Sequence, residues 1–127
     1  MAVFNFPIRR DDHVRLAVRA ARAIQRSWSA RCETLAEVAG LRGRELGVGV
    51  GIHCGELSFG EFGRSHRDVT AIGTVVNLAS RAQSAASAGK ILVTQAVYDR
   101  AKSDLADSQA QDYQLKGFES PIKLFAA

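Results

Sequence analysis

The 127-residue sequence has little cysteine, little proline and no long apolar run. Its two cysteines, Cys32 and Cys54, stand far apart and form no C-x-x-C pair, which argues against a zinc site or a disulfide framework. No apolar stretch approaches the roughly 18 residues that a membrane span needs, and the N-terminal apolar stretch is too short for a signal peptide. We therefore expect a cytoplasmic chain with reduced thiols and no membrane segment.

The sequence also lacks the phosphate-binding pattern G-x-x-x-x-G-K-[ST], although it has 11 glycines. The stretch "LGVGVGIHCGE" alternates glycine with branched apolar residues from Gly47 to Ile52. This period of two predicts a strand with one apolar face and one face without side chains. Such a strand suits a place where another backbone or a ligand comes close.

Composition and length favour an ordinary globular domain. A hydrophobic fraction of 46% and only 2 prolines exclude disordered and collagen-like classes. The net charge of +4 favours anionic partners in general. Four arginines fall at helical spacing opposite the apolar stripe that begins after Asp11 and Asp12, and we interpret them as a solvated helix face: Arg15, Arg19, Arg22 and Arg26.

The patterning predicts strands and helices that alternate and also pair as hairpins, which is typical of an α+β sandwich in a single domain, 1–127. The predicted strands are "AVFNF" (2–6), the Gly-rich strand, a hairpin of 57–63 and 67–73 joined by "GRSHR", "ILVT" (91–94), "DYQLKG" (112–117) and "IKLFA" (122–126). The predicted helices run from about residue 12 to Gly40, from 74 to 86 and from 95 to 103.

The helix "TVVNLASRAQSAA" (74–86) places Asn77 and Arg81 one turn apart on the same face. On periodicity alone, this pair fits a solvated stripe of an amphipathic helix. His53 in the Gly-rich strand and His66 in the hairpin turn are interpreted as structural or solvated.

Taken together, "VGVGIHCGELSFGEFGRSHRDVTAIGTVVNLASRAQSAASAGKILVT" and "LKGFESPIKLF" resemble the C-terminal two thirds of a class III adenylate or guanylate cyclase domain. The most specific element is "IGTVVNLASR". The resemblance implies a ferredoxin-like α/β sandwich of the nucleotide cyclase type, N-terminally truncated. It also implies the conversion of ATP or GTP, with ATP favoured by family habit, to a cyclic 3′,5′-monophosphate and pyrophosphate.

The resemblance assigns roles residue by residue. Arg81 would stabilise charge on the reacting phosphoryl group, and Asn77 would hold the ribose. Thr70 and Ile72 in "VTAIG" would bind the base; a threonine hydroxyl both donates and accepts, so Thr70 suits either purine. Lys116 would contact the terminal phosphates.

The sequence departs from the family at its start, because the two aspartates that hold Mg²⁺ or Mn²⁺ in complete members lie in motifs upstream of the first matched strand. We expect no metal to be held by this chain alone, and no cyclisation by it. Because family active sites form between two chains, a second copy or a complete cyclase domain is the expected protein partner. The sheet edge left unpaired by the missing strand predicts self-association. A non-catalytic nucleotide-binding module, or a protein or nucleic-acid interaction module, is the alternative, although nucleic acid is not an expected partner because no base-stacking motif is visible.

Overall fold

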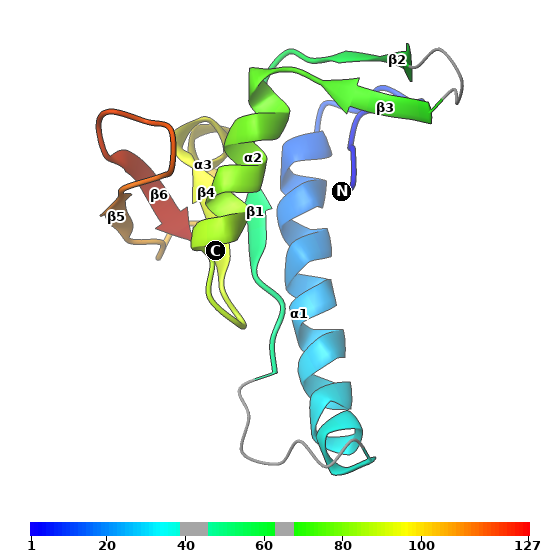
Figure 1. Ribbon diagram of the computed structural model, residues 1–127, viewed down its shortest axis with the longest axis vertical. Helices are drawn as coiled ribbons and strands as arrows, with labels where there is room; N and C mark the ends of the chain where they lie inside the picture. The colour runs from blue at the N-terminus through cyan, green and yellow to red at the C-terminus, as the bar shows by residue number, and fades with distance from the viewer. Residues whose placement is uncertain (39–45, 63–67) are drawn as a thin grey trace.

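The computed structural model describes residues 1–38, 46–62 and 68–127. Figure 1 shows a long helix beside a small sheet, with a two-stranded hairpin that projects from one end. The helices are α1 (His13–Val38), α2 (Thr74–Ala85), α3 (Gln95–Arg100) and the short 3-10 helix η1 (Lys102–Asp104). The strands are β1 (Val50–Ile52), β2 (Ser58–Phe62), β3 (Asp68–Ile72), β4 (Ile91–Thr94), β5 (Ala110–Tyr113) and β6 (Ile122–Ala126).

The main sheet has four strands in the order β1-β4-β6-β5. β1 runs parallel to β4, with Gly51 opposite Leu92, and the other two pairings are antiparallel. Within the described ranges β1 pairs with β4 only and so forms one edge of the sheet. This mixed sheet with helices confirms the α+β prediction.

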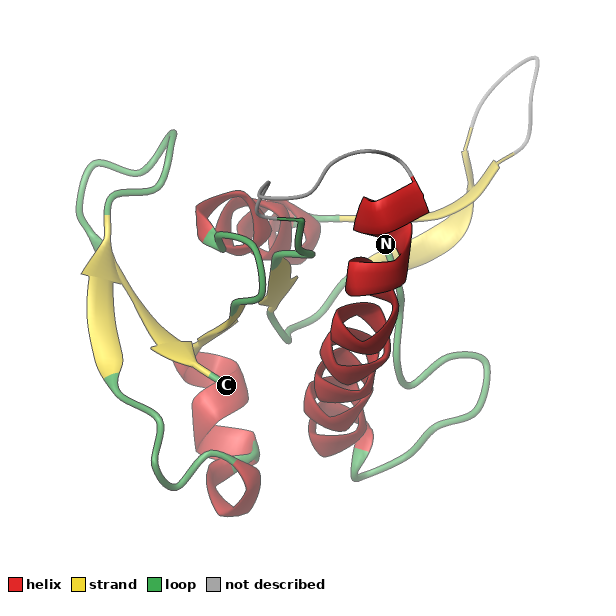
Figure 2. Cartoon of the chain, turned by 90° about the horizontal axis from the view of Figure 1, so that it is seen from below, coloured by secondary structure: helices red, strands yellow, loops and turns green. Residues whose placement is uncertain are grey.

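Helices cover both faces of the sheet (Figure 2). The fully buried strand β4 divides its side chains between two clusters, because alternate residues of a strand point to opposite faces. Ile91 and Val93 pack against α1 and α3, whereas Leu92 packs with Ala82 of α2. α2 therefore lies alone on one face, and α1 and α3 share the other.

The Gly-rich strand lets α2 lie directly on its backbone, as the sequence predicted. A Cβ built on Gly51 would lie 2.1 Å from the amide nitrogen of Gln83 and 2.5 Å from the carbonyl oxygen of Ala79. A Cβ on Gly49 would lie 2.1 Å from the carbonyl oxygen of Ala86. Real side chains do not fit at these distances, so α2 can lie this close to the strand only because glycine stands at every second position. The nearby backbone is that of the helix with Asn77 and Arg81.

The predicted hairpin is confirmed. β2 and β3 pair antiparallel, with Ser58 opposite Ile72 and Gly60 opposite Thr70. The connecting turn "GRSHR", with His66, lies outside the described residues. β3 leads through Gly73 into α2, so the hairpin and the helix form one continuous unit beside the sheet (Figure 1).

The prediction of a strand at residues 2–6 is wrong. Asn5 adopts a φ of 74°, a left-handed conformation that an extended strand cannot contain. Its side-chain oxygen accepts a hydrogen bond from the backbone nitrogen of Arg10 at 2.6 Å, so the segment forms a local turn ahead of α1. Alternation of apolar residues could not reveal that conformation.

The arginine row lies on an exposed face of α1, as predicted, but two of its four members, Arg15 and Arg19, also form ion pairs. The carboxylate of Asp104 in η1 accepts hydrogen bonds from Nε of Arg15 at 2.6 Å and from Nε of Arg19 at 3.1 Å. The hydrogen bond and charge of Arg15, supported by Arg19, hold the pKa of the Asp104 carboxyl below its usual range. These ion pairs join α1 to the end of the α3 region. Residues 89 positions apart in sequence carry no local signal of this contact.

Two element boundaries also differ from the predictions. β5 ends at Tyr113, because the following residues form a turn in which Gly117 has a φ of 85°. α3 ends at Arg100, and the expected helical stretch up to Ser103 continues as η1. The predicted end of the first helix at Gly40 lies outside the described residues, and α1 is described up to Val38.

Candidate functional site

Helix α2 presents Asn77 and Arg81 to solvent. The helix begins after Gly73, whose φ of 151° favours glycine and whose carbonyl oxygen accepts hydrogen bonds from the amides of Val76 and Asn77. Ala82 is fully buried against the sheet, and Leu78 packs beside it. Asn77 and Arg81 lie on exposed positions one turn apart. One face of the helix is therefore fixed by packing, while the other holds an amide and a guanidinium.

Arg81 is electrostatically available for an anion. Within the described ranges, every ion pair uses the carboxylate of Asp12 or Asp104, and none includes Arg81 or Lys116. Neither of these two side chains has a hydrogen-bond partner among the described residues. An unpaired guanidinium presents a planar set of donors that suits phosphate oxygens.

Lys116 occupies the exposed corner of a tight turn beside α2. The amide of Phe118 donates to the carbonyl of Leu115 at 3.1 Å, and the positive φ of Gly117 is the feature that a type II turn requires. Leu115 is buried in the same cluster as Ala82. This anchor brings the Lys116 turn against the helix that carries Asn77 and Arg81, although the two segments are more than 30 residues apart in sequence.

Thr70 and Ile72 lie on β3, which contacts α2. The structure describes their backbones and not their side chains. Ile72 immediately precedes Gly73 and so stands at the base of α2, whereas Thr70 lies further along the hairpin. The backbone connects these positions to the Asn77 helix, and their role in binding a base stays a prediction.

Residues 53–57 form the support beneath the first turn of α2. A Cβ on Gly55 would lie 2.7 Å from Cγ2 of Val75, and the backbone of Leu57 lies just under 4 Å from a Cβ position on Gly73. His53 begins this segment, and its Nδ1 lies 2.7 Å from the hydroxyl of Thr94 at the end of β4. The hydroxyl is buried, and burial lowers the pKa of His53 below its usual value.

This contact is what sequence reasoning missed. His53 had been interpreted as structural or solvated, and the structure gives it a specific partner 41 residues away. The only signal in the sequence was a polar ring within an otherwise apolar and glycine-rich strand.

The donor set of the described residues does not fit a divalent metal. No group of three or more His, Cys, Asp or Glu side chains comes together within 1–38, 46–62 and 68–127. Asp104 is engaged by two arginines, and Asp12 is engaged by Arg10. The expectation that this chain alone holds no metal stays a prediction for the protein in solution.

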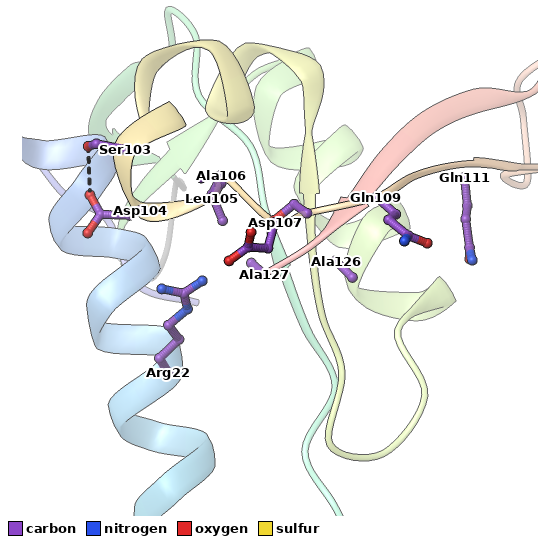
Figure 3. A pocket seen from close by; sticks show the side chains of 11 residues that line it. Arg22, Ser103, Asp104, Leu105, Ala106, Asp107, Gln109, Gln111, Ala126 and Ala127 are labelled. Atoms are coloured by element: carbon purple, nitrogen blue, oxygen red, sulfur yellow. Dashed lines mark hydrogen bonds between the residues drawn. The ribbon is translucent and has the colours of Figure 1, made fainter.

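A groove lies on the opposite side of the sheet from α2. It runs between α1 and the end of β6 and includes Arg22, Asp104 and Asp107 (Figure 3). None of the five predicted site residues lines it. Arg22 projects into this groove toward Asp107, so a carboxylate and a guanidinium face the same space. The groove is separate from the exposed face of α2.

The fold and the exposed Asn77 and Arg81 pair agree with one class of protein, the nucleotide cyclase catalytic domain. The family model described as "Adenylate and Guanylate cyclase catalytic domain" matches residues 1–126. The chain belongs to this family.

Solved structures of cyclases share the fold. The adenylyl cyclase CyaB from P. aeruginosa is 27% identical with a TM-score of 0.73, and the match covers 97% of this chain and 63% of that one. The guanylyl cyclase Cya2 is 25% identical with a TM-score of 0.75, over 97% of this chain and 61% of that one. The guanylate cyclase domain of RhGC from Catenaria anguillulae, in complex with GTP, is 19% identical with a TM-score of 0.70, over 97% and 63%, and supports the fold alone.

This chain spans about three fifths of the length of these solved chains. The search of curated proteins gave no match. Across the described parts of the chain, no helix has both the length and the apolar character that crossing a bilayer requires.

Proposed function

We propose that this chain supplies one half of a nucleotide cyclase active site, the half that binds the nucleoside triphosphate and stabilises the transition state. The observation that carries the proposal is Arg81, which has no ion pair among the described residues, one turn from Asn77 on the exposed face of α2 and within the family-specific stretch "IGTVVNLASR". ATP is the favoured substrate and GTP the second candidate. The product would be the cyclic 3′,5′-monophosphate with release of pyrophosphate.

Arg81 acts on the charge that develops during the reaction. The 3′-hydroxyl oxygen forms a bond to the α-phosphorus, the bond to the pyrophosphate oxygen breaks, and the hydroxyl proton passes to a base. Negative charge shifts onto the phosphoryl and leaving oxygens. A guanidinium already in position stabilises this charge by a few kcal/mol, about the effect of one well-placed donor in acyl transfer.

The other residues hold the substrate. The Asn77 amide orients the ribose so that the attacking oxygen stays in line with the leaving group. Thr70 and Ile72 contact the purine, and the Lys116 ammonium attracts the terminal phosphates. These roles follow the match to the family motifs, and the helix and turn positions described above support them.

The second half of the site comes from a partner. That partner is a second copy of this chain or a complete cyclase domain, and a complete domain would bring the metal-binding carboxylates that the described residues do not bring together. The chain alone therefore binds nucleotide without cyclising it.

A titration of the isotope-labelled chain with a non-hydrolysable ATP analogue tests the binding half directly. We expect shifts of amide resonances around Asn77 and Arg81, and roughly tenfold weaker binding by Arg81→Ala, because a hydrogen bond to a charged group is lost. Arg26→Ala, the loss of another arginine without an ion pair in the described residues, serves as the matched control. Equal affinity of the two variants would contradict the proposal.

The interaction-module alternative makes a different prediction in the same assay. A salt-sensitive response to duplex DNA, together with no response to the nucleotide, would favour it. Asp104 already engages Arg15 and Arg19, which leaves fewer free cations along α1 for such a partner.

A further inference from the structure

We propose that His53 is a positioning residue for the nucleotide site. Its hydrogen bond to Thr94 holds the segment 53–57, which supports the first turn of α2, where Asn77 lies. The effect of His53 on nucleotide affinity rests on the proposed function. Its effect on the position of the first turn of α2 can be tested without any ligand.

The contacts run in one continuous chain. Nδ1 of His53 lies 2.7 Å from Oγ1 of Thr94, a side chain 4% exposed at the carboxyl end of β4. Two residues further, Gly55 approaches Val75 so closely that an added Cβ would lie 2.7 Å from its Cγ2. Val75 lies in the first turn of α2, two positions before Asn77.

Among the described residues, the first turn of α2 has no side-chain hydrogen bond of its own. α2 has no side-chain cap at its N-terminus, and the carbonyl of Gly73 alone accepts from the Val76 and Asn77 amides. Further along, the helix rests on Gly51 and Gly49. The first turn, where Asn77 lies, is supported by the 53–57 segment and by its link through Gly73 to β3, whereas the turn of Arg81 lies on β1.

The described neighbours of the imidazole are uncharged. Nδ1 meets the hydroxyl of Thr94 from β4, and Nε2 lies 3.9 Å from a Cβ position on Gly55. Arg100 of α3 acts on Cys54, where its charge opposes the rise in the thiol pKa that burial causes. Glu56 is the acidic residue of the same segment and is exposed. The neutral imidazole therefore suits the site: Nδ1 accepts from the threonine hydroxyl in the tautomer with its proton on Nε2, and donates to the threonine oxygen in the other tautomer.

Three variants of the whole chain separate the hydrogen bond from the shape of the ring. Thr94→Val keeps the volume and removes the hydroxyl, His53→Phe keeps a ring and removes the nitrogen, and His53→Asn retains an acceptor at a position close to Nδ1. Thr34→Val, the same exchange at an exposed position of α1, is the control for Thr94→Val.

The first readout is ligand-free. We expect the amides of Val75 and Asn77 to shift in Thr94→Val and His53→Phe, to return toward the wild-type positions in His53→Asn, and to stay unchanged in Thr34→Val. The Arg81 amide should move least. Unchanged Val75 and Asn77 resonances in both Thr94→Val and His53→Phe would overturn the proposal, and so would uniform shifts along all of α2.

The second readout is the affinity for the non-hydrolysable ATP analogue at a temperature where every variant is folded. We expect Thr94→Val and His53→Phe to bind roughly 2- to 30-fold more weakly, the range typical of indirect coupling, with recovery in His53→Asn. Affinity unchanged in the shifted variants would overturn the role in binding. Failure of the wild-type chain to bind any nucleotide would instead contradict the proposed function. The ligand-free readout would still show whether His53 and Thr94 position the first turn of α2.

Discussion

His53 is a titratable side chain whose neutral form is favoured by burial in the fold. Burial lowers its pKa from the usual 6.5. The unfolded chain therefore takes up a proton at higher pH than the folded chain does, so stability falls as the pH drops below about 6.5. At higher pH both states are neutral at this position and the effect is absent.

We predict that the free energy of unfolding decreases between pH 7 and pH 5, and that His53→Asn flattens this slope because asparagine does not titrate. Denaturant unfolding measured across this pH range checks the prediction. A slope that is the same in both proteins would contradict it.

Asp104 is a single carboxylate that joins two arginines of α1 to η1. Asp104→Asn removes both charge interactions and leaves the side chain nearly the same size. We predict a lower melting temperature at low salt, with a difference from wild type that shrinks as salt is added, because partly exposed charges are screened. Asp107→Asn, at an exposed carboxylate outside the ion pairs, should leave the melting temperature unchanged; equal effects of the two variants would argue against the contact.

At the scale of elements, the position of α2 depends on glycine at the positions of the Gly-rich strand that face it, Gly49 and Gly51. A methyl group at Gly51 would meet the backbone of α2 at Gln83 and Ala79, which can move only with the helix. A methyl group at Gly55 would meet Cγ2 of Val75 at 2.7 Å, a side-chain atom rather than the helix backbone, so a smaller shift accommodates it.

We predict that Gly51→Ala destabilises the protein by about 1–3 kcal/mol or more, the usual cost of overpacking, and that it shifts the α2 resonances. Gly55→Ala should cost distinctly less. Denaturant unfolding of both variants gives the comparison. A smaller loss of unfolding free energy for Gly51→Ala than for Gly55→Ala would contradict this account of how α2 packs on the Gly-rich strand.

The elements also explain which parts of the structure the sequence could predict. Periodicity identified the Gly-rich strand, the hairpin, α2, β4 and β6, because those patterns are local. The alternation in "AVFNF" was misleading, since the left-handed conformation of Asn5 leaves no trace in apolar spacing. The contacts of His53 with Thr94 and of Arg15 with Asp104 join distant positions, so only the folded chain brings them together.

In the candidate site, too, some features could be predicted from local sequence and others required the folded structure. The spacing of Asn77 and Arg81 was sufficient to place them on one helical face, and the exposed positions on α2 agree with that prediction. The packing of the Lys116 turn against α2 through Leu115 required tertiary structure. The roles of these residues came from the family resemblance, since an amide and a guanidinium one turn apart fit many helix surfaces.

At the scale of the whole molecule, two features favour association. β1 has a described partner on one side only, and an unpaired strand edge is a template for another strand. Large apolar side chains are also exposed near the N-terminus, including Met1 at 84% and Ile8 at 76%. Exposed apolar surface of this kind commonly marks an interface.

We predict that the chain self-associates in a concentration-dependent manner in the micromolar range. Sedimentation velocity over that range checks this, and Ile8→Ser should weaken the association. A single monomeric species at every concentration would contradict the prediction.

The most direct test of the central claim is complementation. The chain would be mixed with a complete cyclase catalytic domain whose own counterparts of Asn77 and Arg81 are replaced by alanine, and cyclic nucleotide would be measured with ATP and Mn²⁺. We predict product from the mixture, no product from either protein alone, and none from a mixture that contains Arg81→Ala. Product from this chain alone, or none from a mixture whose components sediment together, would contradict the claim that it provides one half of the site.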